Sequence, residues 1–349
     1  MAYTTIDDPS AYFQVSTWTG NATSRTIDLD SNSTMQPDFS WVKSRSNAYE
    51  NYWQNSSIGT DKYLRSNRTS SEQSGTIVTY NSSGFGIGSG AENNENSTTN
   101  VGWFWKANGG STSSNTDGDL TSTVQFNSTA KFSIITYTGI DPIEPLDIGH
   151  GMGEAPDVFI VKNRDRTTNW GVYHKDLTSP AENYNLKLNL TNAQAAESTF
   201  WRNEAPTSTI IKTGENASVN VASEKFIIYA WKEVQGFSKF GKYVGNGSTD
   251  GTFVYTGFKP ACVIIKCSSA VTHWRIFDHK RLGYNPSNEK LYPNLDNAEA
   301  TATEIDFLSN GFKIRSSDSD VGNNSSDYIY MAWAKNPFVS SGGIPATAR

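Results

Sequence analysis

The side chains best suited to acid–base chemistry in this chain are four histidines: His150, His174, His273 and His279. His174 lies two residues before Asp176, and His279 directly follows Asp278. A histidine oriented by a carboxylate can act as a general base, but it needs a nucleophile to activate. No G-x-S-x-G turn or comparable nucleophile motif is present. We therefore expect solvated loop histidines and no enzymatic activity.

Carboxylates give no clearer signal. Glycoside hydrolysis requires a pair of acidic residues, one of which has its pKa raised by apolar neighbours. The sequence shows no pair of acidic residues with such neighbours. The stretch "DSDVGNNSSD" brings oxygen ligands close together, as calcium requires, but it lacks the glutamate that completes an EF-hand loop, so we expect a hairpin turn, no bound metal and no cofactor. The residues that a calcium ion would need here are Asp318, Asp320, Asn324 and Asp327.

Aromatic side chains are abundant, with 10 Trp, 16 Tyr and 17 Phe. Sugar rings stack on such faces through their C–H surface. Aromatics in loops therefore have two interpretations, a glycan-binding or assembly surface and local packing, and both stay open. The loop aromatics in question are Tyr49, Tyr52, Tyr63, Trp201, Tyr284 and Tyr292.

The sequence contains an internal repeat, and the repeated elements must position the histidine, carboxylate and aromatic side chains. Three apolar runs, "VGWFWKANG", "FIIYAWKEV" and "YIYMAWAKNPF", close on Trp105, Trp231 and Trp333. Each unit opens with an aromatic-X-Gly and continues with a proline and a strand that ends in lysine: "QPDFSWVK", "APDVFIVK" and "KPACVIIK". Corresponding lysines are more than 100 residues apart, far beyond the period of a solenoid repeat. Each unit is therefore the size of a domain.

Short strands and polar turns in every unit predict an all-β chain of three tandem β-sandwich modules, jelly-roll or lectin-like, with loops rich in Asn, Ser and Gly. A tryptophan follows each of these lysines, Trp53 ten residues after the first and Trp170 and Trp274 eight residues after the other two, so we expect these three tryptophans to correspond. We expect the module cores to contain Trp53, Trp105, Trp170, Trp231, Trp274 and Trp333. Residues 179–199 form either a short helix or an irregular loop. The predicted boundaries are an N-terminal arm at 1–13, modules at 14–108, 131–236 and 237–336, a linker at 109–130 and a C-terminal arm at 337–349.

Composition excludes several functions. With 29 basic and 35 acidic residues, the net charge of -6 disfavours nucleic-acid binding. No apolar run is long enough to span a membrane, and the N-terminus lacks the pattern of a signal peptide, so we expect synthesis in the cytoplasm without membrane insertion. Cys262 and Cys267 are five residues apart on one strand and point to opposite faces, so we expect neither a disulfide between them nor a zinc site.

The chain resembles virion structural proteins of tailed bacteriophages, especially marine and cyanobacterial ones, that are described as tail-fibre-like or capsid-associated. Four features carry the resemblance: the start "MAYTTIDDPSAYFQVSTWTGN", the P-D-aromatic-x-x-VK-x-R strands, the "GF-I…NNSS-YI-x-x-AW" closings and the tail "NPFVSSGGIPATAR". The resemblance extends over essentially the whole chain, and no motif in it transfers a catalytic residue.

This resemblance implies a non-enzymatic virion protein, most simply a tail or fibre-type appendage that contacts the host surface. A capsid decoration protein is the alternative within the same class, and a carbohydrate-binding, lectin-like module is the alternative outside it. The implied partners are other virion proteins, further copies of the chain and a host surface polysaccharide. The two terminal arms are the expected docking segments.

Overall fold

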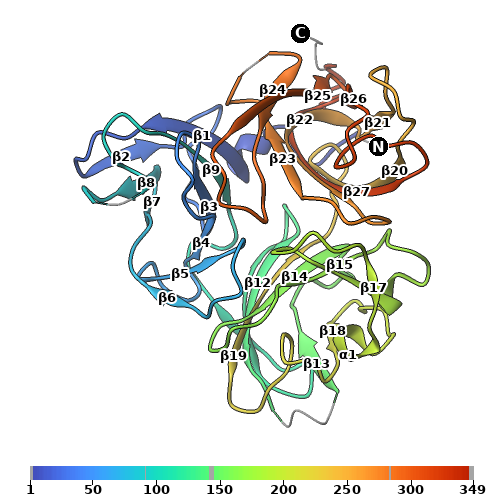
Figure 1. Ribbon diagram of the computed structural model, residues 1–349. Coiled ribbons are helices and arrows are strands. Elements are labelled where there is room, and N and C mark those ends of the chain that lie inside the picture. Colours follow the sequence, from blue (N-terminus) through green and yellow to red (C-terminus); the bar gives the residue numbers. More distant parts are fainter. Residues whose placement is uncertain (1–2, 91, 141–144, 283, 346–349) are drawn as a thin grey trace.

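The structure is a computed structural model that describes residues 3–90, 92–140, 145–282 and 284–345. It is almost entirely β, as expected, and its strands form several antiparallel sheets. Figure 1 shows three lobes around a common centre: a blue first lobe (residues 13–105), a green to yellow second lobe (113–231) and an orange to red third lobe (238–337). Each lobe contains one larger and one smaller sheet.

In the first lobe, a six-stranded sheet packs against a three-stranded one, and a compact apolar cluster that includes Trp18, Val42, Phe85 and Phe104 fills the space between them. The larger sheet is formed, in spatial order, by β1 (Phe13–Thr19), β9 (Thr99–Trp105), β3 (Phe39–Ser44), β4 (Tyr52–Asn55), β5 (Lys62–Arg65) and β6 (Gln73–Ser74). The smaller sheet is formed by β2 (Arg25–Asp28), β8 (Gly84–Ile87) and β7 (Thr79–Asn81).

The second lobe has the largest sheet, formed by β10 (Ser113–Asn115), β11 (Ser122–Asn127), β12 (Phe132–Thr138), β19 (Lys225–Trp231), β14 (Val158–Asn163), β15 (Gly171–His174), β16 (Tyr184–Lys187) and β17 (Ala195–Ala196). Its smaller sheet pairs β13 (Leu146–Gly149) with β18 (Ile210–Thr213).

In the third lobe both sheets have four strands, and the one with more residues in its strands, which we call the larger sheet, is formed by β20 (Ser238–Val244), β27 (Asp327–Pro337), β22 (Phe258–Cys267) and β23 (Arg275–Asp278). The smaller one is formed by β21 (Phe253–Tyr255), β26 (Gly311–Ile314), β25 (Ala300–Leu308) and β24 (Ser287–Lys290). A second apolar cluster, which includes Phe258, Phe312 and Tyr328, lies between these two sheets.

One strand order recurs in the three larger sheets. The strand with the aromatic-X-Gly lies beside the strand that closes on tryptophan, which lies beside the strand that ends in lysine. The orders β1-β9-β3-β4, β12-β19-β14-β15 and β20-β27-β22-β23 therefore correspond. The lysine strands β3 and β14 are buried along their whole length, because both faces of each larger sheet are covered.

Two segments differ from the expectation. Residues 109–130 were predicted as a linker, yet they contain β10 and β11, and β11 pairs with β12 and widens the second sheet. Their polar composition conceals the strand "STVQFN", in which the polar Gln125 is buried as well as Val124, so the burial does not show the simple alternation of a half-buried strand. Residues 179–199 contain a short 3₁₀ turn, η2 (Ala181–Asn183), then strands, and the α-helix α1 (Ser198–Trp201) only begins at their end. Among the described residues, no helix is long and apolar enough to span a membrane.

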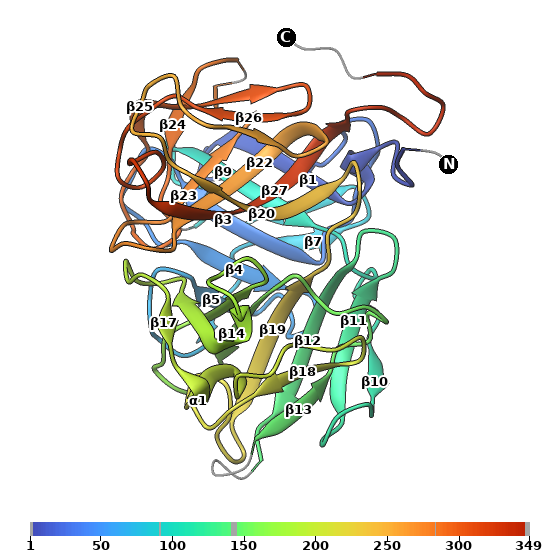
Figure 2. The same ribbon diagram turned by 90° about the vertical axis from the view of Figure 1, so that its right-hand side faces the viewer.

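The two terminal segments lie together on the third lobe (Figure 2). The Tyr3 hydroxyl donates a hydrogen bond to the Gly257 carbonyl oxygen at 2.8 Å, and the Ser341 amide donates one to the Asp7 carboxylate at 2.6 Å. A 3₁₀ turn, η1 (Pro9–Ala11), then leads into β1. The predicted arms extend into residues 1–2 and 346–349, which lie outside the described residues.

Trp105, Trp231 and Trp333 meet at the centre of the three lobes and form what we call the tryptophan core. Their ring centroids are 5.1 to 6.3 Å apart, and every pair is arranged edge to face. This geometry sets the positive edge of one indole against the negative face of the next. All three side chains are at most 3% exposed, and each lies at the same register position in its sheet.

The equivalence of Trp53, Trp170 and Trp274 needs a correction. Trp53 lies opposite Trp41 in the first sheet, a position held by Val172 and Ile276 in the other two. Asn51 holds the position of Trp170 and Trp274, because the backbone amide of each of these three residues donates a hydrogen bond to the side-chain oxygen of an asparagine in the same place: Asn67, Asn189 and Asn294. The first unit has a longer turn before β4, which the alignment of tryptophans did not reveal.

The aromatic-X-Gly signature fixes the turn before each closing strand. The polar tips of Trp18, Tyr137 and Tyr243 donate to carbonyl oxygens in that turn at 2.8, 2.5 and 2.7 Å. A Cβ atom added to the glycine two residues later would come within 2.0 to 2.3 Å of a carbonyl oxygen of the same turn: Gly20 against Glu95, Gly139 against Val221 and Gly245 against Asn323. Glycine is required there because the two backbones approach so closely.

Lys43, Lys162 and Lys266 end their strands with side chains that are fully buried. Each ammonium group donates to the carbonyl oxygen of the residue four positions later, and so organises the loop that follows its own strand. The Nζ to oxygen distances are 3.2 Å from Lys43 to Asn47, 3.3 Å from Lys162 to Arg166 and 3.4 Å from Lys266 to Ala270.

The lobes contact one another in a cycle. Three backbone hydrogen bonds of 2.7 to 2.9 Å join lobe one to two, two to three and three back to one: Glu72 to Arg164, Gln194 to Ser268 and Glu299 to Arg45. Ion pairs reinforce the first and last junctions, Arg164 with Glu72 and Arg45 with Glu299, whereas the middle junction has no charged pair at these positions. The three lobes therefore form a closed ring around the tryptophan core.

We predict that Trp333→Ala lowers the free energy of unfolding by about 3–5 kcal/mol, because it removes a buried ring that all three lobes share. Urea unfolding followed by circular dichroism measures this. Val271→Ala, at a site that is 73% exposed, is the control and should change stability by less than about 0.5 kcal/mol. Equal effects of the two substitutions would contradict a shared core.

We also predict that stability rises between pH 7 and 8.5. Burial lowers the pKa of Lys162 to about 7 and the pKa values of Lys43 and Lys266 to about 8. In this range the unfolded chain holds more protons on these lysines than the folded chain does, so raising the pH favours folding. The slope per lysine is at most about 1.4 kcal/mol per pH unit.

Urea unfolding at a series of pH values measures the slope. Lys162→Met should reduce it, because one of the three lysines is then absent, while Lys242→Met, at an exposed position of β20, should leave it unchanged. A stability that falls from pH 7 to 8.5 would refute the assignment.

Candidate functional site

The histidines are hydrogen-bonded into the fold, and the expectation of solvated loop histidines is wrong for His150 and His174, whose side chains are fully buried. In buried His174, Nε2 lies 3.2 Å from the Tyr330 carbonyl oxygen and Nδ1 accepts from the Asp176 amide. Burial lowers the His174 pKa to about 3, so the ring is neutral near pH 7. His150 and His273 have similar partners, Thr207 and Asn294.

The two histidine–acid pairs do not form as dyads. The Asp176 contact with His174 is made by its backbone amide. The Asp278 carboxylate instead accepts from Arg281 Nε at 2.6 Å and from Trp103 Nε1 at 3.2 Å. Asp278 thus ties the third lobe to the first, and its charge is matched by arginine.

The stretch considered for calcium is also held by arginine. Arg275 forms an ion pair with Asp320 and lies 3.7 Å from an Asp318 oxygen, and it also contacts Glu304 at 3.3 Å. Asp320 additionally accepts a hydrogen bond from the His273 amide. Asn324 and Asp327 do not join them, and no group of three His, Cys, Asp or Glu side chains with metal-binding geometry occurs within the described residues.

The six loop aromatics do not gather on one surface, since the first lobe contains three of them, the second one and the third two. Trp201 is 1% exposed and packs edge to face on Phe159. Tyr52 is buried and donates to Glu92, with Tyr63 packed against its ring.

The remaining three aromatics have partly or fully exposed rings. Half-buried Tyr49 donates to Glu95 at 2.7 Å. The guanidinium of Arg275 lies 4.2 Å from the ring centre of Tyr292 and occupies one of its faces. Only Tyr284, at 68% exposure, presents a large free ring among these six.

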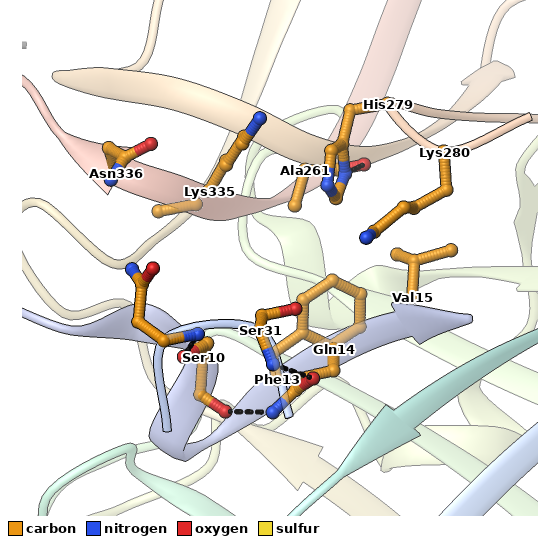
Figure 3. Close-up of a pocket in the computed structure, with 12 residues that line it drawn as sticks. Ser10, Phe13, Gln14, Val15, Ser31, Ala261, His279, Lys280, Lys335 and Asn336 are labelled. Carbon is orange, nitrogen blue, oxygen red and sulfur yellow. Dashed lines mark hydrogen bonds between the residues drawn. The ribbon is translucent and has the colours of Figure 1, made fainter. Parts of the chain in front are cut away.

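A cleft of about 390 Å³ lies where the start of the first lobe meets the third lobe (Figure 3). Its lower wall in this view comes from η1, β1 and the loop after β2, and its upper wall from β22, the turn after β23, and β27. Sequence analysis did not single out these residues, because the repeat does not show which segments meet at the closing junction of the ring. We take this cleft as the candidate site.

Gln14 organises the lower wall. Its buried side-chain amide nitrogen lies within 2.8 to 3.1 Å of the carbonyl oxygens of Ser10, Leu29 and Ser33. Its amide oxygen accepts from the Ser31 backbone at 3.3 Å, as the dashed lines in Figure 3 show in part. One buried amide thus fixes a loop whose backbone also forms an isolated bridge between Asp30 and Thr34, and the wall is preorganised.

The upper wall is cationic. His279 and Lys280 point into the space between the walls, and Lys335 lies on the neighbouring strand (Figure 3). Burial lowers the His279 pKa to about 4, and the ammonium groups of Lys335 and Lys280 also oppose its protonation. Nδ1 of His279 lies 3.1 Å from the Ala261 carbonyl oxygen, so a neutral ring that donates there leaves Nε2 as an acceptor.

Comparisons with known proteins give a family but no function. A family model described as "Domain of unknown function (DUF7483)" matches residues 8–337. A search of curated proteins finds no match. The match includes both walls of the cleft and all three lobes.

We predict that Gln14→Leu, which keeps the side-chain size, lowers the free energy of unfolding by about 1–3 kcal/mol, because it leaves buried carbonyl groups unpaired. The Ser31 amide should also exchange its hydrogen faster, as measured by NMR. Asn32→Ala is the control, since exposed Asn32 makes only a 3.5 Å side-chain contact with Asp8. Unchanged exchange at Ser31 would show that Gln14 does not hold the wall.

Proposed function

The chain belongs to the DUF7483 family, since the family model covers residues 8–337, and we propose that it is a non-enzymatic structural protein of a tailed-phage particle. The resemblance of its terminal and repeated motifs to virion proteins supports this class. The place that we propose for it is a tail or fibre-type appendage that contacts the host surface.

We propose further that the three lobes are three tandem β-sandwich modules of common origin. Their matching strand order, the shared position of the three core tryptophans and the repeated aromatic-X-Gly clamp support this. Three such modules in one chain reproduce, without identical subunits, the packing of a cyclic trimer. Further self-association, expected for virion parts, stays a prediction.

The observation that carries the proposal is the closed ring around the tryptophan core. Its aromatic side chains, buried lysines and arginine–carboxylate pairs connect lobes or fix loops, and the histidines are bonded to the surrounding fold. Side chains with such contacts stabilise a rigid structural protein, whereas an enzyme keeps its reactive side chains accessible to a substrate.

A capsid decoration protein is the second candidate, and the compact shape favours it. A fibre usually carries a long shaft, while the described residues form three lobes about one centre (Figures 1 and 2). The tail appendage and the decoration protein share the same chemistry and differ in where the chain sits on the particle.

Cryo-electron microscopy of the parent particle, with immunogold labelling by an antibody against the purified chain, tests the proposal. We expect density for a three-lobed body on the tail. Density on the capsomers would support the decoration protein and end the tail assignment. Purified particles without the chain would overturn the structural function altogether.

A further inference from the structure

The smaller sheet of the third lobe carries two exposed aromatic rings on its edge strand, β21. Phe253 and Tyr255 are 44% and 53% exposed, while Val254 between them is buried in the apolar cluster that separates the two sheets. Because alternate residues of a strand point to the same face, the two rings lie on one face, about 7 Å apart along the strand. Figure 1 shows β21 on the outer side of the third lobe, away from the common centre.

The fold does not require aromatic rings at these two positions. The strands β2, β13 and β21 hold the same place in their lobes, and they pair with β8, β18 and β26 in matching register. The residues that correspond to Phe253 and Tyr255 are Thr26 and Asp28 in the first lobe and Asp147 and Gly149 in the second. Of the three lobes, only the third has aromatic residues there. An exposed ring that the fold does not need indicates a binding surface.

The contacts of Tyr255 hold its ring in one place. Its hydroxyl oxygen lies 3.2 Å from the hydroxyl oxygen of Tyr3, which donates a hydrogen bond to the Gly257 carbonyl oxygen. Its neighbour on β26 is Gly311, where an added Cβ atom would come within 2.0 Å of the Val254 carbonyl oxygen. The adjacent strand therefore has no side chain beside the ring. A ring that is already fixed loses little conformational entropy when a flat ligand packs on it.

The charged side chains near the rings are paired with one another. Lys313, which lies opposite Phe253 on β26, forms an ion pair with Asp250 at 2.6 Å. Arg315 lies 3.5 Å from a carboxylate oxygen of Asp306. The charges of these four groups cancel, so they favour a neutral ligand over an acidic or a basic one. Their ammonium, guanidinium and carboxylate groups can still exchange hydrogen bonds with hydroxyl groups.

The exposed area distinguishes a sugar from a second copy of the chain. About half of each ring is exposed, which gives roughly 200 Å² of aromatic surface, since an aromatic side chain presents about 150–250 Å². A stable protein interface buries about 800 Å² on each partner. Two rings among paired charges provide only a small part of that area. They match a sugar chain, which combines apolar C–H faces with a hydroxylated rim.

We propose that Phe253 and Tyr255 form a platform for a neutral polysaccharide. The C–H faces of two successive hexose units pack on the two rings, and their hydroxyl groups bond to the charged pair of Lys313 and Asp250. The biological meaning rests on the proposed contact with a host surface, but the binding itself is a property of the purified chain. Microscopy of the particle tests the first and titration of the chain tests the second, so the failure of one is distinguishable from the failure of the other.

Isothermal titration of the full chain with hexamers of β-1,4-linked glucose, mannose and galactose tests the platform. We expect at least one of these neutral hexamers to bind, with an affinity that added salt does not change. Phe253→Thr introduces the residue that the first lobe has at this position, and it should weaken binding about tenfold because one stacking ring is lost. Tyr284→Thr is the matched control. It removes an exposed tyrosine that precedes β24, at the opposite edge of the same sheet, and should leave binding unchanged.

NMR gives a second readout that reports the mode of binding. Saturation of the aromatic protons of the chain should pass to the C–H protons on one face of the bound sugar. Binding of none of the three hexamers, or equal weakening by Phe253→Thr and Tyr284→Thr, would overturn the platform. A chain that is dimeric in sedimentation equilibrium and monomeric as Phe253→Thr would overturn it in favour of a second copy. An unchanged melting temperature of Phe253→Thr shows that any lost binding does not reflect lost folding.

Discussion

Edge-to-face packing of Trp105, Trp231 and Trp333 is the constraint on which the rest of the molecule depends. Each indole lies on an interior strand of one larger sheet, Trp105 and Trp231 at the ends of β9 and β19 and Trp333 four residues before the end of β27, so the three sheets must converge at their tryptophans. The sheets are then covered on both faces, by a smaller sheet outside and by one another inside. That double cover explains why the lysine strands β3 and β14 are buried along their whole length, Ser40 included, and why the lysine near each strand end must find its partners among backbone carbonyls.

The packing around the tryptophan core also determines where polar side chains connect neighbouring lobes. Corresponding positions connect neighbouring lobes with different groups: Asn55 bonds to the Tyr229 hydroxyl, His174 to the Tyr330 carbonyl and Asp278 to the Trp103 indole. An amide, an imidazole and a carboxylate thus perform one structural task. The contact occupies the same place in the three lobes, while its chemistry differs from one lobe to the next. At the junction between the last and first lobes a polar cleft remains open beside these contacts.

The all-β class and the repeated tryptophans at the closing strands followed from the sequence, because a solid apolar run between polar turns has few other solutions. The equivalence of Trp53 with Trp170 did not hold, since identity of residue type suggested an alignment that the pairing of Trp53 with Trp41 rules out. The strands within 109–130 were missed because their outer positions are polar. The cleft could not be foreseen, because Gln14 and Lys280 are distant in the chain and meet only when the ring closes.

The ring closure has a consequence for how the protein is made. The last indole of the core is residue 333, and the junction to Arg45 needs Glu299, so neither exists until most of the chain has been translated. Until then, the first two lobes emerge from the ribosome with the aromatic faces of Phe13 and Trp105 uncovered. Such surfaces attract other hydrophobic segments. Slow translation or a truncated transcript would therefore leave fragments that are prone to aggregation. The exposed aromatic surface is covered only when the third lobe has been synthesised.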